Sequence, residues 1–84
     1  MHLEELVSEF ELSRPTAEHI VKLYGKFGVV HVFGRREVMS VTGLKESTAS
    51  ELIGRLLRKR LVDTVTGQGK GKYKFRDFTQ EVQV

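Results

Sequence analysis

Cysteine is absent from this chain of 84 residues, proline occurs once, and no long apolar run is present. Without cysteine, neither disulfides nor thiolate metal sites can hold the fold together. No apolar run approaches the roughly 20 residues of a membrane span, and no secretory signal pattern opens the chain. We therefore expect one small domain in a soluble, reduced, cytoplasmic protein.

Combinations of residues that carry catalysis or bind metals are also missing. His2, His19 and His31 lie far apart in the sequence, and no Ser/His/Asp, paired-carboxylate or metal-ligand spacing occurs. The glycine-rich segment 67–72 is not a phosphate loop, because that motif continues through lysine and a hydroxyl residue into a helix. We expect no enzymatic activity, no cofactor and no metal.

The net charge of +3 conceals an asymmetry along the chain. Residues 1–34 carry three basic and five acidic side chains, residues 35–76 carry eleven and four, and residues 77–84 add two acidic ones. The middle segment therefore has a charge of +7, between two segments of −2 each. A concentration of this kind is typical of a surface that meets phosphates. The alternative is an ordinary solvated face rich in lysine and arginine.

Hydrophobic periodicity predicts four helices, over residues 2–11, 16–26, 35–42 and 46–59. The predicted apolar stripe of the second helix consists of Ala17, Ile20, Val21, Tyr24 and Phe27. Pro15 suits a first helical turn, and Gly28 is the expected helix terminator. In the fourth helix, Thr48 and Glu51 have the spacing of a capping box, with Glu46 or Ser47 as alternative caps.

Runs of β-branched and aromatic residues predict extended segments at 29–33, 61–66 and 72–76. The glycine-rich loop joins the last two into a hairpin. In its second strand Tyr73 and Phe75 point to one face, while Lys72, Lys74 and Arg76 point to the other. The predicted fold is mainly α with a small antiparallel β-hairpin wing, which is a winged helix-turn-helix. Its parts are an N-terminal helix and connection (1–14), the winged domain with a three-helix core (15–76) and a C-terminal tail (77–84).

The helix-turn-helix interpretation depends on the order of residues from 39 to 57. Gly43 supplies the left-handed turn residue that glycine adopts most cheaply, and Leu44 is expected to fill the angle between the helices. Gly54, on the outer side, lowers helix propensity by about 1 kcal/mol and suggests close approach of a partner. The alternative is an ordinary helical hairpin with a polar surface. The positions typical of the motif are held by Met39, Gly43, Leu44, Ala49 and Leu52.

The residues predicted to bind nucleic acid come from both the helix-turn-helix and the wing. Short hydroxyl side chains on the second helix allow it to enter a major groove about 12 Å wide. Glu46 and Glu51 argue against this, since carboxylates repel phosphates, although glutamate can accept from cytosine. The basic cluster 58–60 is explained first by the helix dipole. The predicted site consists of Arg35, Arg36, Lys45, Ser47, Thr48, Ser50, Arg55, Lys70, Lys72 and Lys74.

Residues 33–76 resemble a bacterial winged helix, most strongly from Gly43 to Phe75. The similar segments are FGRREVMSVTGLKESTAS, LIGRLLRKRLV and GKGKYKF. More narrowly, they resemble the winged-helix modules at the C-terminus of Fic-family (filamentation induced by cAMP) proteins and of some divergent-ATPase regulators. Arg60 departs from the family pattern, which usually has glycine before the Leu-Val that opens the wing.

The Fic resemblance implies an appended regulatory domain and not a catalytic one. The Fic catalytic domain carries a His-Pro-Phe motif and a glycine-rich anion loop, and neither occurs here. Any AMP-transferring activity would belong to a parent protein. We expect this chain to bind double-stranded DNA in the manner of a transcription regulator, with possible homodimerisation through residues 2–11. The alternative is a protein-interaction module on an enzyme, without DNA binding.

Overall fold

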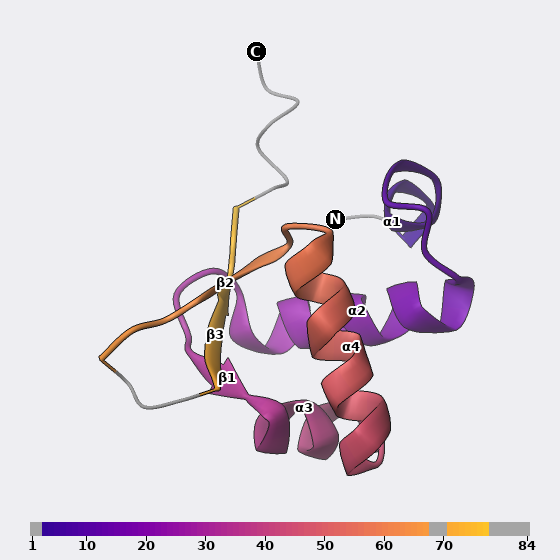
Figure 1. The fold of residues 1–84 in the computed structure, drawn as a ribbon. Helices are drawn as coiled ribbons and strands as arrows, with labels where there is room; N and C mark the ends of the chain where they lie inside the picture. Colours follow the sequence, from indigo (N-terminus) through magenta and orange to yellow (C-terminus); the bar gives the residue numbers. More distant parts are fainter. Residues whose placement is uncertain (1–2, 68–70, 78–84) are drawn as a thin grey trace.

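Helices dominate the part of the chain that the computed structural model describes, residues 3–67 and 71–77 (Figure 1). The elements follow one another as α1 (Leu3–Glu9), α2 (Arg14–Phe27), β1 (Phe33–Gly34), α3 (Arg35–Thr42), α4 (Glu46–Arg58), β2 (Val62–Thr64) and β3 (Lys72–Phe75). The predicted class, mainly α with a small antiparallel sheet, is confirmed. The predicted tail lies outside the described residues beyond Asp77.

Ser13 caps the start of helix α2, and Gly28 ends the helix as the sequence suggested. Ser13 has extended backbone, and its Oγ accepts a hydrogen bond of 3.4 Å from the Thr16 N–H. Pro15 stands in the first turn, where no intrahelical donor is lost. Gly28 closes the helix with φ 58°, and its N–H donates to the Tyr24 carbonyl. The helix therefore begins at Arg14, two residues before the predicted start.

The predicted strand at 29–33 is wrong in its extent. After α2 the chain makes a turn, in which the His31 N–H donates to the Phe27 carbonyl at 3.3 Å. Only Phe33 and Gly34 reach β3 and form a strand. The valines at 29, 30 and 32 have strand propensity but no neighbouring strand to pair with, and propensity yields to that context. Val30 is 71% exposed.

The three strands form one antiparallel sheet with the order β1-β3-β2, so the last strand lies in the middle (Figure 1). Phe33 pairs with Tyr73, and Val62 pairs with Phe75. At the edge of this sheet a Cβ on Gly34 would lie 2.9 Å from the Gly71 carbonyl oxygen. Gly34 is therefore required for the close approach of β3 to the start of α3.

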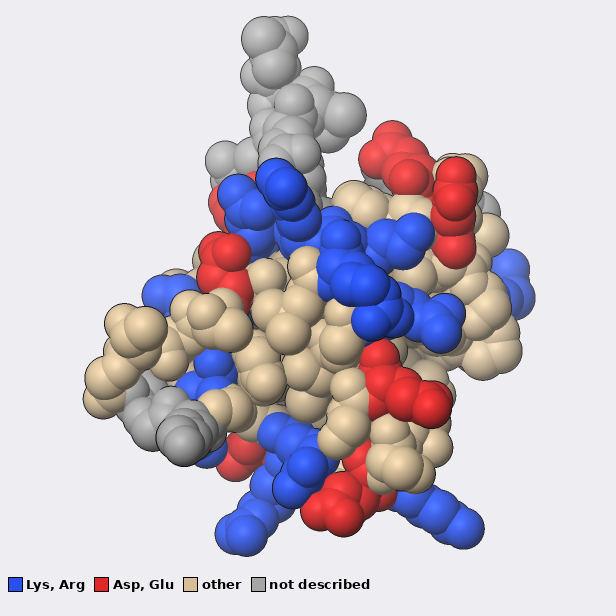
Figure 2. Space-filling view, in the orientation of Figure 1, with Lys and Arg blue, Asp and Glu red and all other residues tan. Residues whose placement is uncertain are grey.

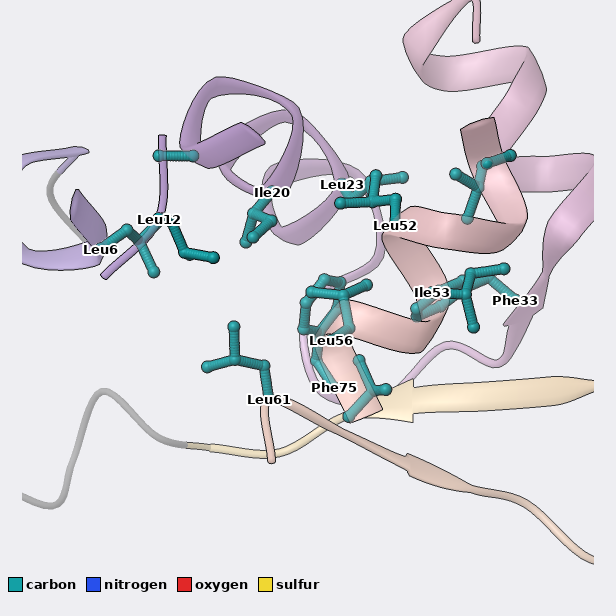
Figure 3. Close-up of a cluster of buried hydrophobic side chains, with 14 residues drawn as sticks. Leu6, Leu12, Ile20, Leu23, Phe33, Leu52, Ile53, Leu56, Leu61 and Phe75 are labelled. Atoms are coloured by element: carbon teal, nitrogen blue, oxygen red, sulfur yellow. The ribbon is translucent and has the colours of Figure 1, made fainter. Parts of the chain in front are cut away.

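A single hydrophobic core joins the helices to the sheet (Figure 3). The Phe33 ring stacks on Phe27, with 5.0 Å between centroids, and lies 5.2 Å from Phe75, which meets Tyr24 edge-on at 5.3 Å. Rings from α2, β1 and β3 thus fix the sheet against the helices. Leu23 is fully buried, although it was omitted from the predicted stripe, and Val21 is only half-buried.

The predicted capping box at the start of α4 is wrong. The N-cap is Lys45, whose side chain makes no capping hydrogen bond, and Thr48 lies inside the helix. The helix ends at Arg58, and Arg60 then adopts the left-handed φ of 61°. This is the position where the winged-helix pattern usually has glycine, so the departure noted in the sequence coincides with backbone that glycine adopts more easily.

None of the helices in the described part of the chain has the length and apolar character needed to cross a membrane.

Candidate nucleic-acid interface

The turn between α3 and α4 is fixed by local hydrogen bonds. Gly43 has φ 79° and ψ 7°, and its N–H donates to the Met39 carbonyl at 2.8 Å. The Thr42 hydroxyl donates to the Val38 carbonyl at 2.6 Å and accepts from the Leu44 N–H at 3.2 Å. Leu44 packs against the core, as predicted. These contacts fix the direction in which α4 leaves the turn.

One side of α4 is buried and the other is open to solvent. Ala49, Leu52, Ile53 and Leu56 face the core. The opposite line follows helical spacings of four, three and four residues, and its members are Ser47, Glu51, Gly54 and Arg58. Flanking this line, further exposed side chains are supplied by Thr48, Ser50 and Arg55. The predicted polar edge of the helix is therefore accessible.

An open cleft of about 790 Å³ lies where the start of α3, the first half of α4 and the start of β3 meet. Four of the predicted site residues line it: Arg35, Arg36, Ser50 and Lys72. Met39 and Ile53 contribute apolar surface to it, and Glu37 and Glu46 contribute carboxylates. Cations that are distant in sequence thus converge beside α3 and α4.

Arg35 connects α3 to α4. Its Nη2 lies 3.0 Å from the Glu46 carboxylate, and its Nη1 donates to the Ser50 hydroxyl at 3.4 Å. Both members of the ion pair are more than half exposed, so it contributes little to stability, roughly 0–1 kcal/mol. Its main consequence is for charge, because Glu46 partly neutralises the arginine nearest to α4.

Glu37 organises the floor of the cleft and was not among the predicted site residues. Its Oε1 accepts a hydrogen bond of 2.8 Å from the Gly34 N–H. This bond lowers the pKa of the Glu37 carboxyl, with smaller contributions from the positive charges of Lys72 and Arg36. The available signal was a glutamate three residues after Gly34, which is the spacing at which a carboxylate caps a helix start.

The remaining predicted residues are exposed but do not line the cleft. Lys45, Ser47, Thr48 and Arg55 lie on or before α4, and Lys74 lies on β3 opposite Asp63. Lys70 is outside the described residues. Arg58 was explained first by the helix dipole and was left out of the predicted site, yet it lies on the outward line of α4 beside the predicted residues. Its helical spacing from Ser47 and Glu51 was the signal that could have placed it there.

Basic side chains are spread over several parts of the face shown in Figure 2, and two groups of them are prominent. One group lies over the C-terminal end of α4, and the other lies at the end of the molecule that α3 occupies, with acidic side chains between them. The positive charge is therefore interrupted and does not form one continuous stripe. Any polyanion that covers both groups must also accommodate carboxylates.

No group of His, Cys, Asp and Glu among the described residues could hold a metal ion. Comparison of the chain with protein-family models, with curated proteins and with solved structures finds no match.

Proposed function

We propose that this chain is a winged helix-turn-helix module that binds double-stranded DNA, as a transcription regulator or as a regulatory domain of a Fic-type protein. The element order supports the winged helix: a helix, a short strand, the helix-turn-helix pair and a hairpin, joined into one sheet. The observation that carries the DNA-binding role is the cleft, where Arg35, Arg36 and Lys72 lie beside the exposed side of α4.

The proposed mechanism separates positioning from base recognition. Arg35, Arg36, Lys72 and Lys74 hold phosphates on either side of the groove, while α4 presents Ser47, Thr48, Ser50 and Arg55 to base edges. Phosphate contacts release counterions, so affinity must fall with salt. For about four neutralised phosphates, the slope of log affinity against log salt is about −3.6.

Fluorescence anisotropy with a labelled random-sequence duplex, titrated between 50 and 200 mM salt, tests this mechanism. The test variant is Arg36→Ala/Lys72→Ala, which removes two cations from the cleft. We expect it to lower affinity about tenfold and to reduce the magnitude of the salt slope by about 1.8. Binding that is indifferent to salt would exclude phosphate-led recognition.

The matched control is Lys22→Ala/Lys26→Ala, which removes the same charge from exposed positions on α2. If this control weakens binding as much as the cleft variant, then binding follows net charge, and the cleft is not the site.

A second candidate function is a protein-interaction module without DNA affinity. The observation that favours it is the Arg35–Glu46 ion pair, together with the acidic side chains that interrupt the basic surface. It predicts no measurable duplex binding at 50 mM salt and a partner surface on α1 or the wing. A reading frame that encodes a Fic motif upstream of Met1 would identify an appended domain, and it would favour this second function only together with the absence of duplex binding.

Homodimerisation through residues 2–11 stays a prediction. Leu6, within the apolar face that motivated it, is 1% exposed and belongs to the chain's own core. Sedimentation at high protein concentration distinguishes the monomer from the homodimer.

A further inference from the structure

Glu51 occupies the middle of the surface that α4 turns to solvent. It follows Ser47 by four residues and precedes Gly54 by three, so the three positions lie along one line of the helix. This line is opposite the buried side chains Ala49, Leu52 and Leu56. Because Ser47 and Gly54 are small, Glu51 is the longest side chain in this central stretch and projects beyond both neighbours.

The two carboxylates of α4 differ in their partners. Glu46 pairs with Arg35 at 3.0 Å. Glu51 forms no ion pair or hydrogen bond through its side chain with any described residue, although Arg55 lies four residues later at a spacing that permits a pair. With respect to the described residues, Glu51 is therefore a free acceptor in the centre of the exposed side of the helix.

A free carboxylate at this position restricts the surfaces that α4 can meet. Covering it without a hydrogen-bond donor would leave an unpaired charge out of water, which is strongly unfavourable. In the major groove, phosphates repel it, and guanine offers only acceptors at N7 and O6. Cytosine offers the N4 amino group as a donor, whereas adenine places its N7 acceptor beside its amino group.

We propose that Glu51 is a specificity-determining residue that accepts a hydrogen bond from the N4 amino group of a cytosine in the major groove. This inference rests on the proposed DNA-binding function and adds to it a base requirement. The ligand is then a duplex with a C·G pair at the position under the centre of α4. Ser47 and Gly54 leave room for the helix to approach that base pair closely.

Selection of duplexes from a random library, with wild-type protein and with Glu51→Gln and Glu51→Ala, tests the inference. We expect the wild type to enrich cytosine at one position, by about tenfold in affinity over the other bases. Glu51→Gln should move the preference at that position to adenine, because an amide bonds to adenine N6 and N7 together. Glu51→Ala should lose the preference there while keeping the phosphate-dependent affinity.

Glu18→Gln is the charge-matched control, since Glu18 is exposed on α2, away from the proposed surface. Base preference that is the same in the wild type and both Glu51 variants would overturn the inference and leave the proposed function standing. If the wild type binds no duplex, both fail. A change that Glu18→Gln reproduces would assign the effect to net charge and overturn the inference as well. Thermal unfolding of each variant verifies that the exposed substitutions leave the fold intact.

Discussion

The two longest helices of the described chain, α2 and α4, are built differently at their ends. Helix α2 starts with a side-chain cap from Ser13 and stops at Gly28. Helix α4 starts at Lys45 without a side-chain cap and is followed by Arg60 in a left-handed conformation. Charges at the ends of α4 do follow the helix dipole, with Glu46 in the first turn and Arg58 in the last. The charges at the helix starts differ as well, because α2 has no acidic residue in its first turn.

The difference in the caps shows that the residues of α4 are not arranged for the stability of the helix alone. Its hydroxyl residues Ser47, Thr48 and Ser50 lie beyond the N-cap position, where they cannot cap and are exposed. An interior glycine does not distinguish the two helices, since Gly25 of α2 and Gly54 of α4 both lower helix propensity. Under the proposed function, the exposed hydroxyl side chains of α4 face the DNA.

The largest expected effect on stability comes from the close approach of Gly34, in β1, to the carbonyl oxygen of Gly71, just before β3. In Gly34→Ala the new methyl group meets the Gly71 carbonyl oxygen at 2.9 Å and the Glu37 carboxylate at 3.3 Å. Either β3 or the start of α3 must shift, so we expect a loss of about 2 kcal/mol in the free energy of unfolding. Urea unfolding measures it. Unchanged stability would show that the sheet edge can move freely.

Exchanging the caps tests the comparison directly. Ser13→Ala removes the cap of α2 and should lower stability by about 1 kcal/mol. Lys45→Ser supplies the missing cap of α4 and should raise stability by about 1 kcal/mol. Because Lys45 belongs to the site predicted from the sequence and Ser13 does not, we expect only Lys45→Ser to weaken DNA binding in an anisotropy titration. Equal DNA affinity of both variants would remove Lys45 from the site.

The interior glycines provide a matched pair of substitutions. A Cβ at Gly25 of α2 meets nothing within 4 Å, and one at Gly54 meets only the end of the flexible Arg58 side chain at 3.4 Å. Both alanine variants should therefore gain up to about 0.8 kcal/mol from helix propensity. We expect Gly54→Ala alone to weaken duplex binding in an anisotropy titration. Unimpaired binding by Gly54→Ala would mean that the helix does not approach a partner at that residue.

Arg60→Gly should give a smaller gain. Relief of the left-handed conformation contributes roughly 1–2 kcal/mol, and the greater freedom of glycine in the unfolded chain offsets roughly 0.5–1 kcal/mol of it. The expected net gain is about 0.7 kcal/mol, measured by urea unfolding. A decrease would show that contacts of the Arg60 side chain outweigh the backbone cost.

The smallest effect is a dependence of stability on acid pH. The pKa of Glu37 is lowered in the folded state below 4.5, chiefly by the Gly34 N–H. The contribution of the ionised Glu37 carboxylate to the free energy of unfolding is therefore present in full above that value. It is lost as the pH falls through the pKa of the folded state. Glu37→Gln should be less stable than the wild type at pH 7, and the difference should shrink below pH 4. A difference that is constant with pH would exclude the charge of Glu37 as its cause.

Local signals predicted the helices well and the contacts between them poorly. Pro15, Gly28 and Gly43 act through backbone geometry within a few residues, so they located helix ends in the sequence. The extent of β1 depends on where β3 lies, and no pattern within residues 29–33 contains that information. Likewise, the sequence placed Arg36 and Lys72 in one predicted binding site but did not give the geometry of the cleft that they line. The ion pair between Arg35 and Glu46 depends on the angle between α3 and α4, which no local pattern contains.

The position of β3 in the middle of the sheet has a consequence for synthesis on the ribosome. Strands β1 and β2 pair only with β3, which is made last. While residues 72–75 are still inside the exit tunnel, Phe33 lacks the Phe75 ring that covers it in the finished molecule. The helices can form from near-neighbour contacts as they emerge, but closure of the core must await the emergence of residues 72–75.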